Sequence, residues 1–201
     1  MFEIIRYGDF KCENTEEKKH QIILTHTSRN LEEYIQSLKH RYNGKNKKIP
    51  NYIITKEGKI LQLLENTEYP ELFVEDKVNR NLIVVCLENL GWLQKEPLND
   101  HYVNWIGDIY KGSVFEKKWR DYFFWEPYTD LQIEATAFIC KKLFKEMSIK
   151  HQIIGHNTKI SGVEKYEGVV TKSNFRQEFT DVNPSFDFEL FLKHIEDEQF
   201  T

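Results

Sequence analysis

The sequence predicts a single-domain α/β protein with a mixed central β-sheet, flanking helices and one aromatic-rich insertion. Three observations favour this class. Apolar runs typical of strands alternate with helical patterns along the chain, and one pair of strands reads as a hairpin. The chain has 201 residues, 40% of them hydrophobic, which is enough for one sizeable core. No internal repeat or low-complexity segment divides it, so we expect one domain over residues 1–201.

Several short segments rich in β-branched and apolar residues are predicted as strands. In chain order they are residues 2–6, residues 21–27, the two arms of a hairpin within 51–65, residues 81–88 and residues 152–156. The hairpin turns around Glu57 and Gly58. The segment NLIVVCLE, residues 81–88, is continuously apolar, as is typical of a central strand buried on both faces. The last segment, QIIGH, is expected to end at His156.

Three helices are predicted between these strands. The first has apolar residues at helical spacing, namely Leu31, Tyr34, Ile35 and Leu38, and Gly44 follows it as a stop. Thr129 and Gln132 fit a capping box that begins a helix over 130–147. The last helix begins near Ser185 and buries Phe188, Phe191, Leu192 and Ile195.

The insertion covers about residues 93–127 and is unusually aromatic. All four tryptophans lie in or beside it: Trp92, Trp105, Trp119 and Trp125. Such a segment either packs over the core or lines a groove for a sugar or peptide, and a packed cover is the more common outcome.

The overall composition excludes several classes of protein. A net charge of -4 argues against a general nucleic-acid binder. The longest apolar run, NLIVVCL, is too short to cross a bilayer, and the N-terminal residues have no apolar stretch typical of a signal peptide. The three cysteines are far apart, so they indicate neither a disulfide framework nor a cysteine-rich zinc site.

Three motifs place candidate metal ligands at the ends of predicted elements. THTS carries His26, IIGHN carries His156, and FTDVNPSFDF carries Asp181. Two imidazoles and a carboxylate can hold zinc and leave a fourth position for water, whose pKa the metal lowers. A lone histidine at a strand end is more often a satisfied polar residue, so the spacing by itself is a weak indication.

The chain carries, in this order, the motifs IILTHTS, IPNYIITKEGKILQLLE, NLIVVCLENLG, YTDLQIEATAFICKKL, IIGHN and TDVNPSFD. Together they resemble the zinc-dependent N-acetylmuramoyl-L-alanine amidases, which share their fold with peptidoglycan recognition proteins and small phage endolysins. The resemblance covers about residues 21–192, apart from the insertion and the loop 158–176. It implies a mixed sheet with packed helices, and hydrolysis of the amide between the lactyl group of muramic acid and L-alanine.

The resemblance also implies a zinc ion held by two histidines and a cysteine or aspartate. By position, His156 matches the second histidine and Asp181 the third ligand. The first strand of the family often ends in two adjacent histidines, of which the first binds the metal, and this alignment places Thr25 at the ligand position with His26 beside it. If the strand shifts by one residue at a β-bulge, His26 takes the ligand position instead. The direction of the two side chains stays open, and we expect zinc on His26, His156 and Asp181.

Other positions also depart from the family pattern. Phe179 stands where many members carry a lysine that stabilises the oxyanion, and Lys172 or Arg176 is a candidate substitute. Cys86 stands where many members carry a glutamate, and Pro50 stands where the members with cysteine usually have a tyrosine.

Two residues near these positions are candidates for proton transfer. Glu88 lies two residues beyond Cys86 and therefore on the same strand face, although a surface carboxylate at a strand end is more common. Tyr52 lies two positions after Pro50.

Two function hypotheses follow. The first is a zinc amidase that hydrolyses peptidoglycan, and the second is a degenerate module that binds peptidoglycan without zinc. In a third, weaker hypothesis the aromatic insertion binds a protein partner. We expect a muropeptide as the partner, no nucleic-acid or membrane partner, and a monomer. The resemblance suits a bacterial or bacteriophage lytic protein that is made in the cytoplasm and acts on the cell wall, after release or as part of a virion.

Overall fold

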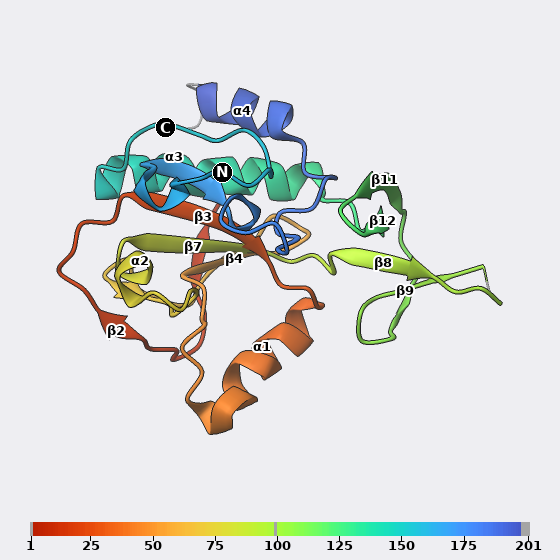
Figure 1. The fold of residues 1–201 in the computed structure, drawn as a ribbon. Helices are drawn as coiled ribbons and strands as arrows, with labels where there is room; N and C mark the ends of the chain where they lie inside the picture. The colour runs from red at the N-terminus through yellow and green to blue at the C-terminus, as the bar shows by residue number, and fades with distance from the viewer. Residues whose placement is uncertain (1, 99, 198–201) are drawn as a thin grey trace.

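A six-stranded mixed sheet forms the centre of the molecule, with the strand order β1-β5-β4-β7-β3-β13 (Figure 1). The computed structural model describes residues 2–98 and 100–197. In sheet order the strands are Ile4–Arg6, Ile60–Gln62, Tyr52–Ile54, Leu82–Leu87, Gln21–His26 and Gly168–Thr171. Neighbouring strands run parallel except β4 and β5, the predicted hairpin. The predicted mixed sheet is therefore confirmed, and β7 is a central strand buried along its whole length.

Helices α3 (Asp130–Met147) and α4 (Phe188–Glu196) cover one face of this sheet (Figure 1). The α3 helix begins at the predicted capping box, because Thr129 accepts a hydrogen bond from the Gln132 N–H and donates its own N–H to the Gln132 side chain. Apolar side chains of both helices join those of β3, β4 and β7 in the main core.

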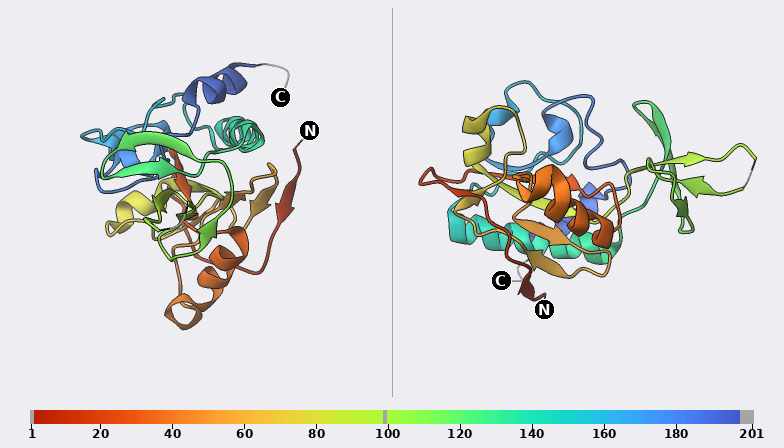
Figure 2. Two further views of the ribbon diagram at one scale, coloured as in Figure 1. Left: turned by 90° about the vertical axis from the view of Figure 1, so that its right-hand side faces the viewer. Right: turned by 90° about the horizontal axis from the view of Figure 1, so that it is seen from below.

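The opposite face carries α1 (Leu31–His40), the 3-10 turn η1 (Arg41–Gly44) and the short helix α2 (Asp76–Arg80) (Figure 2). Ile35 and Leu38 of α1 pack against β4, β5 and β7. The remaining short elements are β2 (Glu13–Asn14), β6 (Glu68–Tyr69) and the 3-10 turns η2 (Val163–Lys165) and η3 (Lys172–Asn174). No helix in the described ranges has the length and apolar character needed to cross a membrane.

The alternation along β3 decides which side chains reach each face. Ile22 and Leu24 belong to the core under α3, whereas Ile23 packs in a cluster on the opposite face. Because successive side chains of a strand point to opposite faces, Thr25 shares the face of Ile23, and His26 shares the face of Leu24. The two residues that end β3 thus diverge.

The aromatic insertion builds a second sheet of five strands, ordered β10-β9-β8-β12-β11, which projects from the body as an arm (Figures 1 and 2). These strands are Ile109–Tyr110, Tyr102–Val103, Trp92–Lys95, Tyr122–Trp125 and Phe115–Trp119. Trp125 is fully buried, and the Trp92 ring stacks on Tyr122 with centroids 4.6 Å apart. The insertion is therefore a folded unit with its own packing.

The segment 152–156 differs from the prediction, because only Ile153 makes a β-bridge, to Val169. The edge of the sheet is taken instead by β13, which the sequence did not suggest. Gly168 opens this strand with φ of 131°, and a Cβ there would lie 2.1 Å from the carbonyl oxygen of Gln152. Glycine permits this close approach, so the chain at Gln152 packs against the start of β13.

Candidate functional site

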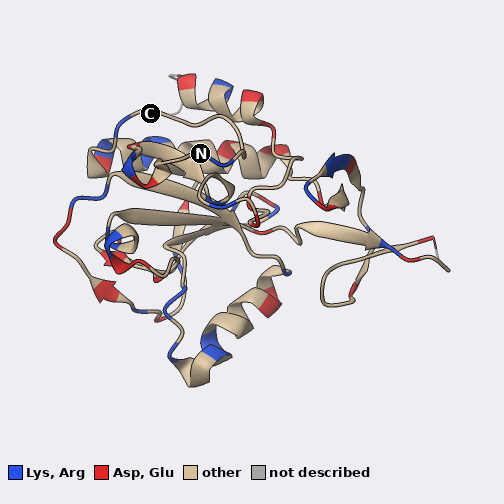
Figure 3. Ribbon diagram, in the orientation of Figure 1, with Lys and Arg blue, Asp and Glu red and all other residues tan. Residues whose placement is uncertain are grey.

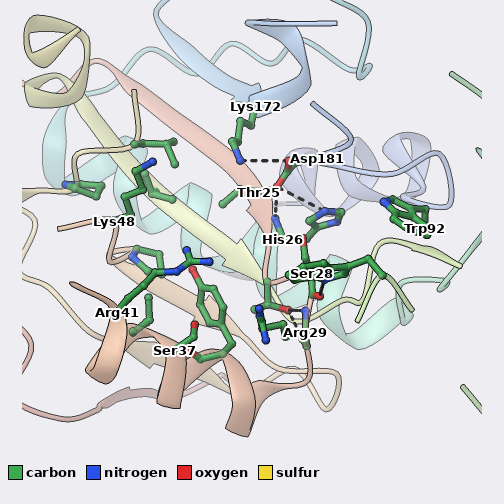
Figure 4. A pocket seen from close by; sticks show the side chains of 18 residues that line it. Thr25, His26, Ser28, Arg29, Ser37, Arg41, Lys48, Trp92, Lys172 and Asp181 are labelled. Carbon is green, nitrogen blue, oxygen red and sulfur yellow. Dashed lines mark hydrogen bonds and ion pairs between the residues drawn. The ribbon is translucent and has the colours of Figure 1, made fainter. Parts of the chain in front are cut away.

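A cleft of about 380 Å³ opens where β3 ends, between β3, α1 and the base of the arm (Figure 4). Its walls come from distant parts of the chain: Thr25, Tyr34, Lys48, Trp105, Lys172 and Asp181 all line it. The carboxyl ends of the parallel strands β3 and β7 meet at this edge, which is a common place for binding sites in parallel sheets.

Asp181 is the centre of the polar contacts in the cleft (Figure 4). Its Oδ1 accepts hydrogen bonds from the Thr25 hydroxyl at 2.5 Å and from the His26 backbone N–H at 3.1 Å. Its Oδ2 lies 3.5 Å from Nζ of Lys172. Burial by itself would raise the pKa of Asp181, but the Lys172 charge and these donors outweigh it and hold the pKa well below its usual range. The carboxylate is therefore ionised and fully engaged.

Lys172 reaches Asp181 because of the position of β13. Thr171, the last residue of β13, pairs with Leu24 of the parallel strand β3, so the next residue, Lys172, lies beside Thr25. The ammonium also lies 4.7 Å from the centre of the Phe179 ring, a cation–π distance. Lys172, a candidate replacement for the lysine of the family pattern, thus lines the cleft.

His26 is oriented differently from Thr25. Its Nδ1 lies 3.3 Å from the Tyr128 hydroxyl, on the α3 side of the sheet, and a Cβ on Gly91 would lie 2.9 Å from its Cε1. Nε2 is 3.7 Å from Oδ1 of Asp181. Burial lowers the pKa of His26, so the imidazole is neutral near pH 7 and this contact is not an ion pair. Both residues line the cleft, and it is the Thr25 hydroxyl that makes the direct hydrogen bond to Asp181.

The third predicted ligand, His156, lies outside the cleft. Its side chain is exposed, and its Nδ1 accepts a hydrogen bond from the Thr158 N–H at 3.2 Å. Its backbone carbonyl accepts one from Asn174. The structure thus brings His26 and Asp181 together but leaves His156 apart. Within residues 2–98 and 100–197, no three His, Cys, Asp or Glu side chains are grouped to hold a metal ion.

The donor set around Asp181 does not fit zinc. Zinc needs lone pairs from neutral imidazole, thiolate or carboxylate. Here Thr25 supplies a hydroxyl that donates to Asp181, and Lys172 supplies an ammonium, which has no lone pair for a metal. The neutral imidazole of His26, with Nε2 3.7 Å from Asp181, can act as a ligand but does not complete the set. Both carboxylate oxygens already have partners. The zinc site on His26, His156 and Asp181 stays a prediction, of which the structure brings two residues together and leaves His156 apart.

The two predicted proton-transfer residues also lie away from the cleft lining. Both carboxylate oxygens of Glu88 accept backbone N–H groups, from Leu31 at the start of α1 and from Lys56 in the hairpin turn. Tyr52 is buried, donates to Asn66 at 2.8 Å, and has its pKa raised to about 12 by burial. The structure gives Glu88 a role in holding two segments together and Tyr52 a role in the core.

Two of the residues that depart from the family pattern, Pro50 and Cys86, lie at or beneath the cleft. Pro50 lines the cleft. Cys86 is fully buried beneath it, and its Sγ lies 3.8 Å from the hydroxyl of Tyr34. Burial raises the pKa of Cys86 to about 12, so its thiol is protonated and behaves as a small core residue.

Positive charge dominates the cleft. Four of its lining side chains are cationic, Arg29, Arg41, Lys48 and Lys172, and Asp181 is the sole acidic one among the described lining residues. Elsewhere acidic residues are spread over the helices (Figure 3). The first three cations could not be predicted from the sequence, because they lie in different segments and form no motif.

Two tryptophans of the arm, Trp92 and Trp105, also line the cleft. Trp105 donates from its indole N–H to the Ser28 carbonyl at 2.6 Å, and the Arg29 guanidinium lies 4.7 Å from its ring centre. The arm is thereby joined to the end of β3. Part of the insertion therefore forms a wall of the cleft, which is the less common of the two outcomes considered for it.

Comparison with known families gives a match to the profile described as N-acetylmuramoyl-L-alanine amidase, over residues 16–167. The match ends before Lys172 and Asp181. No curated protein sequence matches the chain.

Several solved structures share the fold. The N-acetylmuramoyl-L-alanine amidase LysC from Clostridium intestinale superposes with a TM-score of 0.58 at 12% identity, covering 96% of this chain and 97% of that one. The selenomethionine derivative of AmpD superposes with a TM-score of 0.56 at 14% sequence identity, covering 97% of this chain and 96% of that one. The amidase AmiD from E. coli superposes with a TM-score of 0.55 at 16% sequence identity, covering 92% of this chain and 60% of that one. That structure is a complex with the substrate anhydro-N-acetylmuramic acid-L-Ala-D-γ-Glu-L-Lys.

Proposed function

Because the chain belongs to the N-acetylmuramoyl-L-alanine amidase family, we propose that it recognises peptidoglycan fragments and that the cleft around Asp181 binds the muropeptide. The observation that carries this proposal is the cleft itself: four cationic side chains and two tryptophans converge there in a chain whose net charge is -4.

The chemistry of a muropeptide suits this lining. The fragment bound to AmiD combines a sugar with a peptide whose γ-linked glutamate and terminal lysine leave carboxylates free. Arg and Lys bind carboxylates through charge-assisted hydrogen bonds, and aromatic rings pack against the apolar faces of a ligand. We propose that Arg29, Arg41 and Lys48 take the carboxylates and that Trp92 and Trp105 contact the sugar or the peptide backbone.

Binding without cleavage is the function that the geometry supports best. Hydrolysis of an amide needs an activated water, and zinc is the agent that would activate it in this family. The side chains next to Asp181 do not fit zinc, and neither Glu88 nor Tyr52 lines the cleft. The zinc amidase remains the second candidate function, favoured by the family match and by the carboxylate at the predicted third ligand position.

Three measurements on the same preparation test this proposal. We expect the purified protein to sediment with cell-wall sacculi, to bind a soluble anhydro-muropeptide in calorimetry, and to release no stem peptide from either. Metal analysis after dialysis against zinc should find far less than one zinc per chain. Release of stem peptides by a zinc-containing protein would support the second candidate instead, and no binding to either ligand would contradict both.

A variant pair assigns the binding to the cleft. The double variant Arg41→Met/Lys48→Met removes two cations that are exposed at the cleft and should weaken muropeptide binding by about tenfold or more. Lys193→Met, on the exposed side of α4, removes a charge of the same sign on the other face of the sheet and should bind as the wild type does. Equal weakening by both changes would mean that the overall charge, and not the cleft, controls binding.

The site of action follows from the ligand. We propose that the protein acts at the bacterial cell wall as a monomer, either after release from a cell or as part of a virion, as expected from the sequence.

A further inference from the structure

Three side chains from separate segments meet in the cleft: Thr25 at the end of β3, Lys172 after β13, and Asp181 in the segment before α4. Thr25 and Lys172 both direct their polar atoms at the Asp181 carboxylate, one at each oxygen. Thr25 lies 2.5 Å and Lys172 3.5 Å from the carboxylate oxygen that each of them contacts. Because Thr25 and Asp181 are both buried, this cluster is part of the packed structure and not a chance contact at the surface.

Two of these residues stand at positions where the family pattern has metal ligands. The family pattern places a metal ligand at Thr25 and another at Asp181. The second histidine of the family corresponds to His156, which lies outside the cleft, and the parallel pairing of β13 and β3 brings Lys172 to the Asp181 carboxylate instead. Beside Asp181 the chain therefore carries a hydroxyl and an ammonium, neither of which is a normal zinc ligand.

The charges at this place are balanced without a metal. The Lys172 ammonium neutralises the buried Asp181 carboxylate, and the Phe179 ring covers another side of the ammonium at 4.7 Å. The Lys172 side chain is still 22% exposed and lines the cleft, and an ammonium has three N–H donors, so Asp181 does not use all of them.

We propose that the Lys172 ammonium occupies the position of the family's metal ion and makes this a metal-independent binding site, where it donates a hydrogen bond to a carbonyl or carboxylate oxygen of the bound muropeptide. The identity of the ligand rests on the proposed function, whereas the replacement of the metal rests on the geometry of Thr25, Lys172 and Asp181. Because these two parts are independent, separate measurements test them.

The first measurement tests whether metal-binding side chains introduced beside Asp181 allow the protein to bind zinc. The double variant Thr25→His/Lys172→His places two imidazoles beside Asp181 and should take up about one zinc per chain, measured by elemental analysis after dialysis against zinc. The wild type and the two single variants should take up far less. A folded double variant that holds no zinc, or a wild type that holds one equivalent, would overturn the replacement of the metal.

The second measurement concerns the ligand contact. Lys172→Met should weaken anhydro-muropeptide binding by about tenfold or more in calorimetry, since a hydrogen bond to a charged donor is lost. Because this change leaves Asp181 buried without its counter-charge, Lys172→Met/Asp181→Asn is made in parallel as a charge-balanced variant. Lys193→Met is the control. Unchanged affinity in both Lys172 variants would show that the ammonium does not contact the ligand.

The experiments distinguish failure of the proposed muropeptide binding from failure of the proposed replacement of the metal by Lys172. A wild type that binds no muropeptide contradicts the proposed function, yet the zinc measurements on the double variant still decide what occupies the metal position. Conversely, muropeptide binding by a zinc-loaded wild type would keep the cell-wall ligand and reject the role of Lys172.

Discussion

Lys19 lies on the segment that leads into β3, and its side chain is almost completely buried. The ammonium donates hydrogen bonds to the backbone carbonyls of Arg80 at 2.9 Å and Glu68 at 3.3 Å, and it lies 5.8 Å from the Tyr69 ring centre. No carboxylate pairs with it directly among these contacts. Burial therefore lowers the pKa of Lys19 to about 8.

This shift makes stability depend on pH in a definite direction. Between pH 8 and 10.5 the unfolded chain holds a proton on Lys19 that the folded chain has released, so the free energy of unfolding rises with pH. From pH 7.5 to 10 this group should add about 2 kcal/mol in the wild type. The gain should be absent in Lys19→Met, as followed by urea unfolding at each pH.

The neighbouring lysine supplies the control for this prediction. Lys18 is exposed, so Lys18→Met should keep the pH dependence of the wild type. If Lys19→Met and the wild type change in parallel with pH, the ammonium of Lys19 is not desolvated as described.

Gly168 gives a second prediction at this scale. A Cβ at this residue would lie 2.1 Å from a backbone oxygen, and its φ is 131°. Gly168→Ala should therefore lower the free energy of unfolding by at least about 2 kcal/mol. Gly162 has a φ of 74° but no atom within 4 Å of an added Cβ, so Gly162→Ala should cost only about 1 kcal/mol, from strain alone. Equal midpoints in chemical denaturation would contradict the steric argument.

Among the elements, α3 and β7 were predicted closely because their signals are local. The α3 helix runs over 130–147 as expected, since its capping box and its apolar spacing lie within one segment. Strand β7 follows from one continuous apolar run. Strand β13 was missed because four residues carry little pattern and its stability comes from pairing with β3, which lies far away in the sequence.

The arm is the element whose role depends most on its neighbours. Trp105 is 44% exposed, yet its indole N–H bonds to the Ser28 carbonyl and its ring faces Arg29 at the cleft. Trp105→Ala should weaken muropeptide binding by about fivefold to tenfold while leaving the melting temperature almost unchanged.

The arm also provides the matched control for this change. Phe123 is 48% exposed on the same arm and is not part of the cleft lining, so Phe123→Ala should leave affinity unaltered. A large fall in melting temperature with Trp105→Ala, or an equal loss of affinity with Phe123→Ala, would assign the arm a purely structural role.

For the whole molecule, the separation of charge is the property on which the proposed ligand binding depends. The chain carries a net charge of -4, whereas the described cleft lining has four cations and one carboxylate. In the proposed function, exposed Arg41 and Lys48 attract an anionic muropeptide through solvent, and salt screens such attraction. Buried Asp181 and its partners are screened much less.

Salt should therefore weaken binding without abolishing it. Raising NaCl from about 0.05 to 0.5 M should weaken the affinity for an anionic muropeptide by about tenfold. A muropeptide with amidated carboxylates should bind more weakly and show little dependence on salt. Calorimetry at the two salt concentrations with both ligands provides the check, and a salt effect of the same size for the amidated ligand would exclude carboxylate recognition by the exposed cations.

The sequence by itself determined the family, the mixed sheet and the main helices, because these follow from local patterns and from the order of motifs along the chain. It also singled out Asp181, through its place in the family resemblance. Only the tertiary structure decided which side chains surround that carboxylate. Thr25 and Asp181 are separated by 156 positions, and Lys172 joins them through a strand that exists only when paired with β3. The direction of Thr25 relative to His26 depends on strand register, and register is fixed by packing across the whole sheet and not by the residues at one strand end.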